Sequence, residues 1–361
     1  MGSLAIKYQF LNIYKLGGGV VVESKEQIKK IVKKRRKYLV IASLIFMINL
    51  ILFSYVQQLL ESVSSRPITE EIIEIESGSS LGQVTDDLYK NGLIKNPLAF
   101  KIYIRIRGLA TKIQAGYYQL SSSMSAIEIA DTLVKGRVAT YKLTLPEGIT
   151  IEEIGDILAK RGLNKEKFLS LAKNKEVDLF STPVTVKYNL EGFLFPETYQ
   201  IPYGADEKEI IDIMVNEFKR RIKPLEEEIK KSEYDLYQII TIASLIQAEA
   251  QIKDEAPVIA SVIYNRLNRG MKLQLDATVQ YSLSERKSRL LYSDLKVDSE
   301  YNTYQNIGLP PGPINNPGIE MIKAALKPED TDYLYYVVTK KGRHTFTKSY
   351  REHLEVQRRL K

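Results

Sequence analysis

The feature that most constrains this chain is a long uncharged segment near its N-terminus. Residues 39–56 read LVIASLIFMINLILFSYV, and the next charged residue is Glu61. A helix rises 1.5 Å per residue, so a stretch of this length can cross a hydrocarbon core of about 30 Å. We therefore expect a transmembrane helix at residues 38–60, with the chain divided between the two sides of a membrane.

Five adjacent cations precede this segment, at residues 33–37. The positive-inside rule keeps such a cluster in the cytoplasm and sends the chain after the segment outside. A cleaved signal peptide is the alternative, but the apolar run is longer than a usual h-region and no A-x-A-like site follows. We expect an uncleaved single-pass anchor in the cell (inner) membrane, with residues 1–37 as a cytoplasmic tail and residues 61–70 as an extracytoplasmic linker.

The charge and composition of the chain limit the classes of function that we expect for it. The net charge is +8, but residues 1–38 hold ten Lys or Arg and two Asp or Glu, so this tail carries the whole excess. The remaining 42 basic residues (52 less 10) balance the remaining 42 acidic ones (44 less 2). We therefore expect no nucleic-acid partner. With no Cys and two His, the chain offers no thiolate site and too few His ligands for a zinc site, so we expect no metal and no cofactor.

A strand–turn–helix pattern occurs twice after the apolar segment. Residues 72–80 read IIEIESGSS and residues 142–150 read KLTLPEGIT, so each alternates like a strand before a glycine turn. Ser80 and Thr150 can each cap a following helix, and Ser125 starts a partial third copy. Small units of this kind resemble LysM modules, which bind polymers of N-acetylglucosamine.

One carboxylate continues an apolar helix face in the second half of the chain. Residues 234–251 read YDLYQIITIASLIQAEAQ, and a helical wheel places Ile242, Leu245, Ile246 and Glu249 on one side. Burial against aliphatic groups would raise the pKa of Glu249, so that it could donate a proton near neutral pH. The alternative is a helix end at which Glu249 reaches solvent, and the helix pattern leaves both open.

Two later segments suit an extended binding groove. Residues 301–318 read YNTYQNIGLPPGPINNPG, which is too rich in Pro, Gly and Asn for a helix or a central strand. Its Tyr and amide side chains can stack on sugars and hydrogen-bond to them, although its Pro-Pro-Gly also fits ordinary turn chemistry. Asn265 and Arg266, on a preceding predicted helix, could reach a ligand or lie on ordinary surface.

These segments together resemble a known family. The motifs are EGFLFPETY (191–199), ASLIQAEA (243–250), SVIYNRL (261–267), LQLDATVQY (273–281), YNTYQNIGLPPGPINNPG (301–318) and GRHTF (342–346). In order and spacing they resemble the endolytic murein transglycosylases, the YceG-like family, from about residue 72 to residue 361. The resemblance implies an α+β fold with a single N-terminal transmembrane helix, a small LysM-like strand–helix module at residues 71–140, and an α+β YceG-like catalytic domain at residues 141–361 outside the cytoplasm.

The resemblance also assigns residues to the site. It implies that Glu249 is the catalytic acid and base, while Gln247 stands where many relatives carry a second glutamate. Leu275 and Ala277 replace a Thr and a Pro of the family's pattern, which puts the shape of that loop in doubt. The residues that we expect to bind substrate are Glu191, Asn265, Gln274, Asp276, Tyr301, Asn302, Tyr304, Asn316 and His344.

The resemblance implies a water-free reaction on peptidoglycan glycan strands. The bond between MurNAc and GlcNAc is cleaved, and the MurNAc 6-hydroxyl closes a 1,6-anhydro ring, so one carboxyl can serve both steps. A hydrolytic muramidase with Asp276 or Glu191 as its base is one alternative, and a non-enzymatic glycan-binding scaffold of the cell-wall synthesis machinery is the other. Expected partners are the glycan strands and the lipid bilayer, with cell-wall synthases as candidate protein partners.

Overall fold

The structure, a computed structural model, describes residues 25–65, 70–176, 186–339 and 342–360. It combines helices with three two-stranded antiparallel sheets, which confirms the predicted α+β class. The first 24 residues of the predicted cytoplasmic tail and residues 66–69 of the predicted linker lie outside the described residues. The chain divides into two compact units, Met1–Arg137 and Val138–Lys361. The predicted division into a module at residues 71–140 and a catalytic domain at residues 141–361 stays a prediction.

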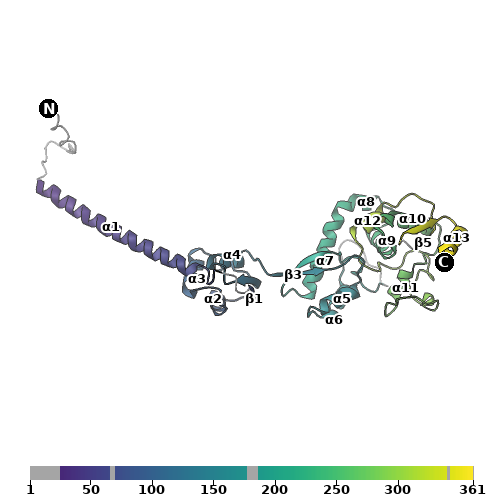
Figure 1. Ribbon diagram of the computed structural model, residues 1–361, viewed down its shortest axis with the longest axis horizontal. Coiled ribbons are helices and arrows are strands. Elements are labelled where there is room, and N and C mark those ends of the chain that lie inside the picture. The colour runs from purple at the N-terminus through teal and green to yellow at the C-terminus, as the bar shows by residue number, and fades with distance from the viewer. Residues whose placement is uncertain (1–24, 66–69, 177–185, 340–341, 361) are drawn as a thin grey trace, which may run out of the picture. The chain divides into compact units, whose positions relative to one another are not determined.

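Helix α1 (Lys25–Leu60) contains the uncharged segment (Figure 1). Its apolar window, within Lys29–Leu60, has a mean hydropathy of 2.5, and none of that window is buried inside the protein. Exposed apolar side chains over such a length are unfavourable in water and suit a lipid environment. The predicted N-terminal apolar helix is therefore confirmed, and its exposure fits a single-pass anchor better than the core helix of a soluble domain.

The first unit also contains a small strand–helix body. Strand β1 (Glu70–Ile75) pairs antiparallel with β2 (Gly116–Ser121), so that Ile72 lies opposite Gln119. The helices of this body are α2 (Leu81–Lys90), α3 (Pro97–Ile106) and α4 (Ala126–Val134). Its core is made of apolar side chains that these elements turn inward, namely Val84, Leu88, Phe100, Ile104, Tyr118, Leu120, Ile129 and Leu133. The body is thus closed by packing of helices on one two-stranded sheet.

The predicted strand–turn–helix repeat is confirmed. Ser80, Ser125 and Thr150 each cap a helix through a reciprocal capping box with the third helical residue. The glycine turns before two of these caps, Gly78 and Gly148, have φ values of 83° and 81°, a region that favours glycine. The resemblance to LysM modules rests on this repeat and stays a prediction.

The second unit begins with a sheet covered by helices. Strand β3 (Thr140–Thr144) pairs antiparallel with β4 (Thr198–Pro202). Three helices cover this pair, α5 (Ile151–Ala159), α6 (Lys165–Asn174) and α7 (Glu207–Ile222). Their shared core contains Leu143, Ile154, Leu158, Phe168, Leu194, Ile201, Ile210 and Met214. This shared core packs the β3–β4 sheet against the three helices.

Helix α9 (Leu236–Glu249) is the centre of the rest of this unit. It packs against α10 (Ala256–Asn268) and α12 (Ile319–Leu326), and the three lie together in Figure 1. The other elements are α8 (Glu226–Lys231), α11 (Asp276–Ser282), β5 (Tyr335–Val338), β6 (His344–Thr347), α13 (Tyr350–Leu360) and the 3-10 helices Lys223–Leu225, Lys253–Glu255 and Asp294–Lys296. Residues 239–246 of α9 are all buried, so this helix is apolar all round rather than along one stripe.

Candidate active site

Glu249 is the last residue of α9. A capping box between Asp235 and Gln238 starts this helix, and the extended backbone of Ala250 ends it. The end of α9 opens into a cleft of about 640 Å³. The cleft is lined by side chains from α9, α10, α11, β5, α13 and the connecting segments, which are Glu249, Val262, Ile263, Arg266, Leu273, Gln274, Leu275, Asp276, Tyr292, Leu295, Tyr304, Tyr335, Tyr336, Tyr350, His353 and Gln357.

The carboxyl group of Glu249 is partly buried in this cleft. Burial raises the pKa of Glu249 above its usual range, and the charge of Asp276 raises this pKa further. Tyr336, His344 and Arg266 act in the opposite direction, because a hydrogen bond or a positive charge favours the ionised form. The net effect is a carboxyl that keeps its proton to higher pH than an exposed glutamate does.

Tyr336 holds this carboxyl group in position. The hydroxyl of Tyr336, on β5, donates a hydrogen bond to Oε2 of Glu249 over 3.0 Å. Burial raises the pKa of Tyr336 well above its usual range, so the hydroxyl keeps the proton that it donates. The sequence pattern did not identify this residue, because the two side chains are 87 positions apart in the chain.

His344 lies behind Tyr336 rather than in the cleft wall. Its ring packs edge-on against the Tyr336 ring, with centroids 5.2 Å apart. Its Nδ1 lies 2.7 Å from Oε2 of Glu255, and its backbone N–H also donates to that carboxylate. The structure thus places His344 as a support for Tyr336, and direct contact of His344 with substrate stays a prediction.

Arg266 joins three parts of the cleft wall. Its Nε donates to the carbonyl of Leu334 over 2.7 Å, and its guanidinium donates to the carbonyl of Leu273 over 2.7 Å. The guanidinium also lies 5.0 Å from the centroid of the Tyr335 ring. Arg266 therefore fixes α10 against both β5 and the segment before α11, a role that its position on a predicted helix did not indicate.

Gln274, Asp276 and Tyr304, three of the residues expected to bind substrate, line the cleft, and their contact with substrate stays a prediction. The Tyr304 hydroxyl donates to Oδ1 of Asp276 over 2.6 Å. Gln274 has a φ of 52°, the only positive φ outside glycine in the described ranges, and its backbone N–H bonds to the carbonyl of Thr303. A non-glycine residue in this region costs about 1–2 kcal/mol, so the hydrogen bonds to the 301–318 segment hold a strained backbone at the cleft.

Asn265, Tyr301 and Asn302 do not line this cleft. Asn265 donates to the carbonyls of Thr331 and Tyr333, over 2.7 Å and 3.0 Å. Asn302 is buried and donates to the carbonyl of Val297 over 2.8 Å. Tyr301 is buried against the ring of Tyr281, with centroids 4.9 Å apart. These three side chains hold loops in place, and their contact with substrate stays a prediction.

Glu191 and Asn316 form a buried cluster of hydrogen-bonded groups and do not line this cleft. Glu191 is 1% exposed and accepts hydrogen bonds from the backbone of Ile151 (3.1 Å), the hydroxyl of Tyr281 (3.0 Å) and the amide of Asn316 (3.3 Å). The side-chain oxygen of Asn316 also accepts a hydrogen bond from the backbone N–H of Leu194. Burial raises the pKa of Glu191 to about 8, although the hydrogen bonds from Tyr281 and Ile151 favour its charged form. This cluster joins segments that are more than a hundred residues apart in the sequence.

Gln247 has a structural contact of its own. Its Oε1 accepts the backbone N–H of Gly318 over 2.9 Å, which joins the last turn of α9 to the start of α12. Gln247, Ala248 and Ala277 line a second cleft of about 420 Å³. Glu249 directly follows Ala248 in the chain, and Asp276 directly precedes Ala277. The two clefts are therefore lined by adjacent residues of the same two short segments. In the part of the chain that the structure describes, no three metal-binding side chains come together.

Comparison with known proteins gives consistent matches over most of the chain. The sequence profile of the YceG-like family matches residues 73–359. The endolytic murein transglycosylase of Bacillus subtilis (strain 168) is 37% identical over 318 residues, which cover 83% of this chain and 88% of that protein. The endolytic murein transglycosylase of Streptococcus pneumoniae serotype 2 is 30% identical over 315 residues, which cover 79% of this chain and 57% of that protein. A solved structure of a putative yceG-like protein from Listeria monocytogenes has 36% identity and a TM-score of 0.56, and the match covers 80% of this chain and all of that one.

Proposed function

Because this chain belongs to the YceG-like family, we propose that it cleaves peptidoglycan glycan strands internally, with Glu249 as the only acid and base of the reaction. The chain is an enzyme, a lytic transglycosylase, as the curated relatives indicate. The bond is the one between MurNAc and GlcNAc, and the product ends in 1,6-anhydroMurNAc. The observation that carries the proposal is the partly buried carboxyl of Glu249, positioned by Tyr336 in a cleft.

The reaction runs in two proton transfers through one carboxyl group. Protonated Glu249 donates to the glycosidic oxygen as the bond from C1 of MurNAc to that oxygen breaks, so GlcNAc leaves with a hydroxyl. The carboxylate then takes the proton of the MurNAc 6-hydroxyl, whose oxygen bonds to C1. Glu249 regains its proton and no water is consumed. The attacking oxygen is already part of the substrate, so no second carboxylate has to activate a water.

Two features of the cleft support this role. Tyr336 donates to Oε2, whereas Oε1 receives no hydrogen bond from the residues that the structure describes, which leaves that oxygen for the proton in transit. The raised pKa keeps the carboxyl protonated before the first step. The neighbouring second cleft gives room for further sugars on one side of the bond, as an enzyme that cuts inside a polymer requires.

The product distinguishes this mechanism from hydrolysis. We expect mass spectrometry of glycan strands digested in heavy-oxygen water to show anhydro ends that lack one water and carry no heavy oxygen. Reducing ends labelled with heavy oxygen would contradict the proposal and would favour a hydrolytic muramidase. Asp276 would then be the candidate base, because it lines the same cleft as Glu249.

We also propose that residues 61–361 lie outside the cytoplasm, where peptidoglycan is built. Residues 33–37 are five cations directly before the apolar part of α1, and such clusters stay inside. A reporter enzyme that is active only outside the cytoplasm should be active when it is fused after Lys361. The same reporter fused after Met1 serves as the control and should be inactive, and the reverse pattern would rule out this orientation. Cell-wall synthases remain candidate partners in that compartment.

Two substitutions should move the pH profile of cleavage in opposite directions. Tyr336→Phe removes a hydrogen bond that lowers the pKa of Glu249, so the alkaline limb of the rate profile should move to higher pH. Asp276→Asn removes a negative charge that raises this pKa, so the limb should move to lower pH. His344 and Arg266, the other groups that act on this pKa, are unchanged in both variants. The measurement is the rate against pH for both proteins, and a shift in the same direction would argue against Glu249 as the titrating acid.

A further inference from the structure

Helix α3 carries an apolar stripe that the protein does not cover. Leu98, Ile102 and Ile106 are 66%, 45% and 79% exposed, and their spacing of four residues places them along one face. On the other side of the helix, Phe100 and Ile104 are fully buried in the first unit. The helix therefore has two apolar faces, and only one of them is buried in the folded protein.

This helix is held at the end of the proposed membrane span. Helices α1 and α3 are in contact, and Leu60, the last residue of α1, is 3% exposed. Lys95, just before α3, lies 3.9 Å from the carboxylate of Glu61. Leu60 lies four positions after Val56, the last residue of the uncharged segment 39–56, which is a rise of about 6 Å along the helix. The α3 stripe is thus attached close to the place where α1 leaves the bilayer.

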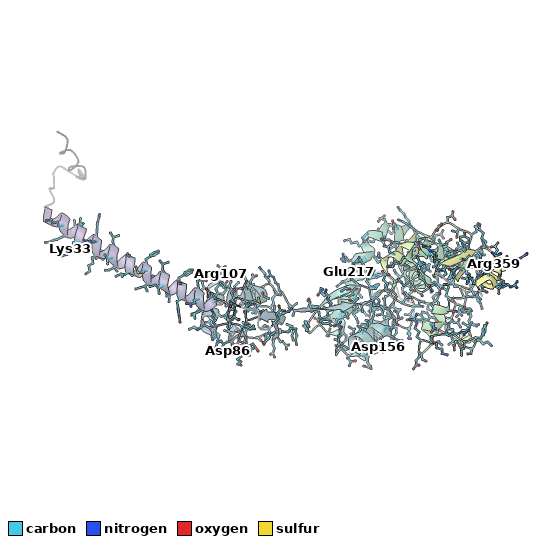
Figure 2. The ribbon with its side chains drawn as sticks, in the orientation of Figure 1. Lys33, Asp86, Arg107, Asp156, Glu217 and Arg359 are labelled. Carbon is cyan, nitrogen blue, oxygen red and sulfur yellow. The ribbon has the colours of Figure 1, made fainter. Side chains whose placement is uncertain are left out.

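The chain segment that carries the stripe has charged residues of one sign only. Residues 95–112 contain five Lys or Arg and no Asp or Glu. Lys101 pairs with Asp86 across 3.1 Å, whereas Arg105 and Arg107 form no ion pair within the described residues. Arg107, labelled in Figure 2, directly follows the last residue of α3. Apolar residues on one face with cations beside them are typical of helices that lie at the surface of an anionic bilayer.

We propose that α3 docks on the same membrane that α1 crosses. Leu98, Ile102 and Ile106 enter the boundary between headgroups and acyl chains, while Arg105 and Arg107 meet anionic phospholipid headgroups. A stripe of three residues binds weakly by itself, but its attachment to α1 converts docking into an intramolecular step with a high effective concentration. The first unit then has two fixed points on the bilayer, which holds it against the membrane surface. This inference requires α1 as an anchor and does not depend on the proposed chemistry of Glu249.

The chain contains no cysteine, so single labels can be introduced cleanly. The full chain with Ile102→Cys or Ile106→Cys would carry an environment-sensitive fluorophore and be reconstituted into vesicles of equal parts phosphatidylglycerol and phosphatidylcholine. Ile127→Cys on α4, where the native side chain is 36% exposed, is the matched control, and Phe46→Cys marks the span. Phosphatidylcholine brominated on its acyl chains should quench the labels at 102 and 106 several-fold more strongly than the label at 127.

The charge variant tests the choice of lipid. Arg105→Glu with Arg107→Glu should lower the quenching of the 102 label, and so should vesicles of phosphatidylcholine alone. The inference would be overturned if the labels at 102 and 106 are quenched no more than the label at 127 while the label at 46 is quenched. It would also be overturned if the 102 label is shielded from water but is not quenched by brominated lipid, because the stripe would then be covered by protein.

Discussion

We expect Glu249→Gln to lower the rate of strand cleavage at least about 10²- to 10⁴-fold, the range that general acid–base catalysis contributes. The amide keeps the shape of the side chain and still accepts the hydrogen bond from Tyr336, but it has no proton to transfer. Melting temperature should therefore stay close to that of the parent. The measurement is the initial rate of release of anhydro-ended strands, read by mass spectrometry.

Glu320→Gln is the matched control for this substitution. Glu320 lies on α12 with about half of its side chain exposed, and its partner is Lys323 at 2.9 Å. An exposed pair of this kind contributes about 0–1 kcal/mol, so both activity and stability should be nearly unchanged. A folded Glu249→Gln protein that cleaves strands at the parent rate would remove Glu249 from the mechanism and leave Asp276 as the carboxylate of the cleft.

Substitution of Glu191 should have the opposite effect. The protein should lose stability but keep its rate of strand cleavage. Glu191→Ala leaves three buried donors without an acceptor, from Ile151, Tyr281 and Asn316. Each such donor costs about 1–3 kcal/mol, so for three donors we expect a loss of roughly 3–9 kcal/mol in the free energy of unfolding. For a unit of this size the melting temperature should fall by about 10 °C or more. Calorimetry measures this change, and the rate per folded molecule should remain near that of the parent.

The pH dependence of stability tests the same residue. The pKa of Glu191 is raised from 4.5 to about 8 in the folded state, so between these values only the unfolded state loses its proton. The contribution of Glu191 to stability is therefore complete below pH 4.5 and is lost as the pH rises toward 8. Glu191→Gln does not titrate, so its denaturation midpoint should fall less between pH 5 and pH 8 than that of the parent. An equal fall, or loss of cleavage by a stable Glu191→Gln protein, would contradict a purely structural role.

Sequence patterns predicted more of the local structure than of the site. The α9 helix was expected, whereas the pattern left open whether Glu249 continues an apolar face or stands at the end of the helix. The structure shows that residues 239–246 are buried on all sides of the helix and that Glu249 is its last residue. The surroundings of Glu249 depend on its position in the final turn of α9, because the helix ends at the cleft. Tyr336 was not predicted as a site residue, since nothing in its local pattern distinguishes it from an ordinary strand position. For Arg266 the sequence left contact with a ligand and a place on ordinary surface both open.

The features that could be predicted from the sequence depend on interactions between near neighbours in the chain. The uncharged stretch within α1, the capping boxes at Ser80 and Thr150, and the turns at Gly78 and Gly148 each depend on a few adjacent residues. These signals are complete in a short window, so they can be recognised before any fold is known. The family motifs likewise located Glu249 by its position within a short segment.

The roles of the two glutamates, Glu249 and Glu191, depend on contacts between distant parts of the chain. Tyr336 reaches Glu249 across 87 positions, and Asn316 reaches Glu191 across 125. A carboxylate has no fixed role in isolation, because its pKa depends on the burial and the donors that distant segments provide. Packing therefore made Glu249 a partly buried acid at a cleft and made Glu191 a fully buried acceptor of three hydrogen bonds, although both are glutamates in equally distinctive motifs.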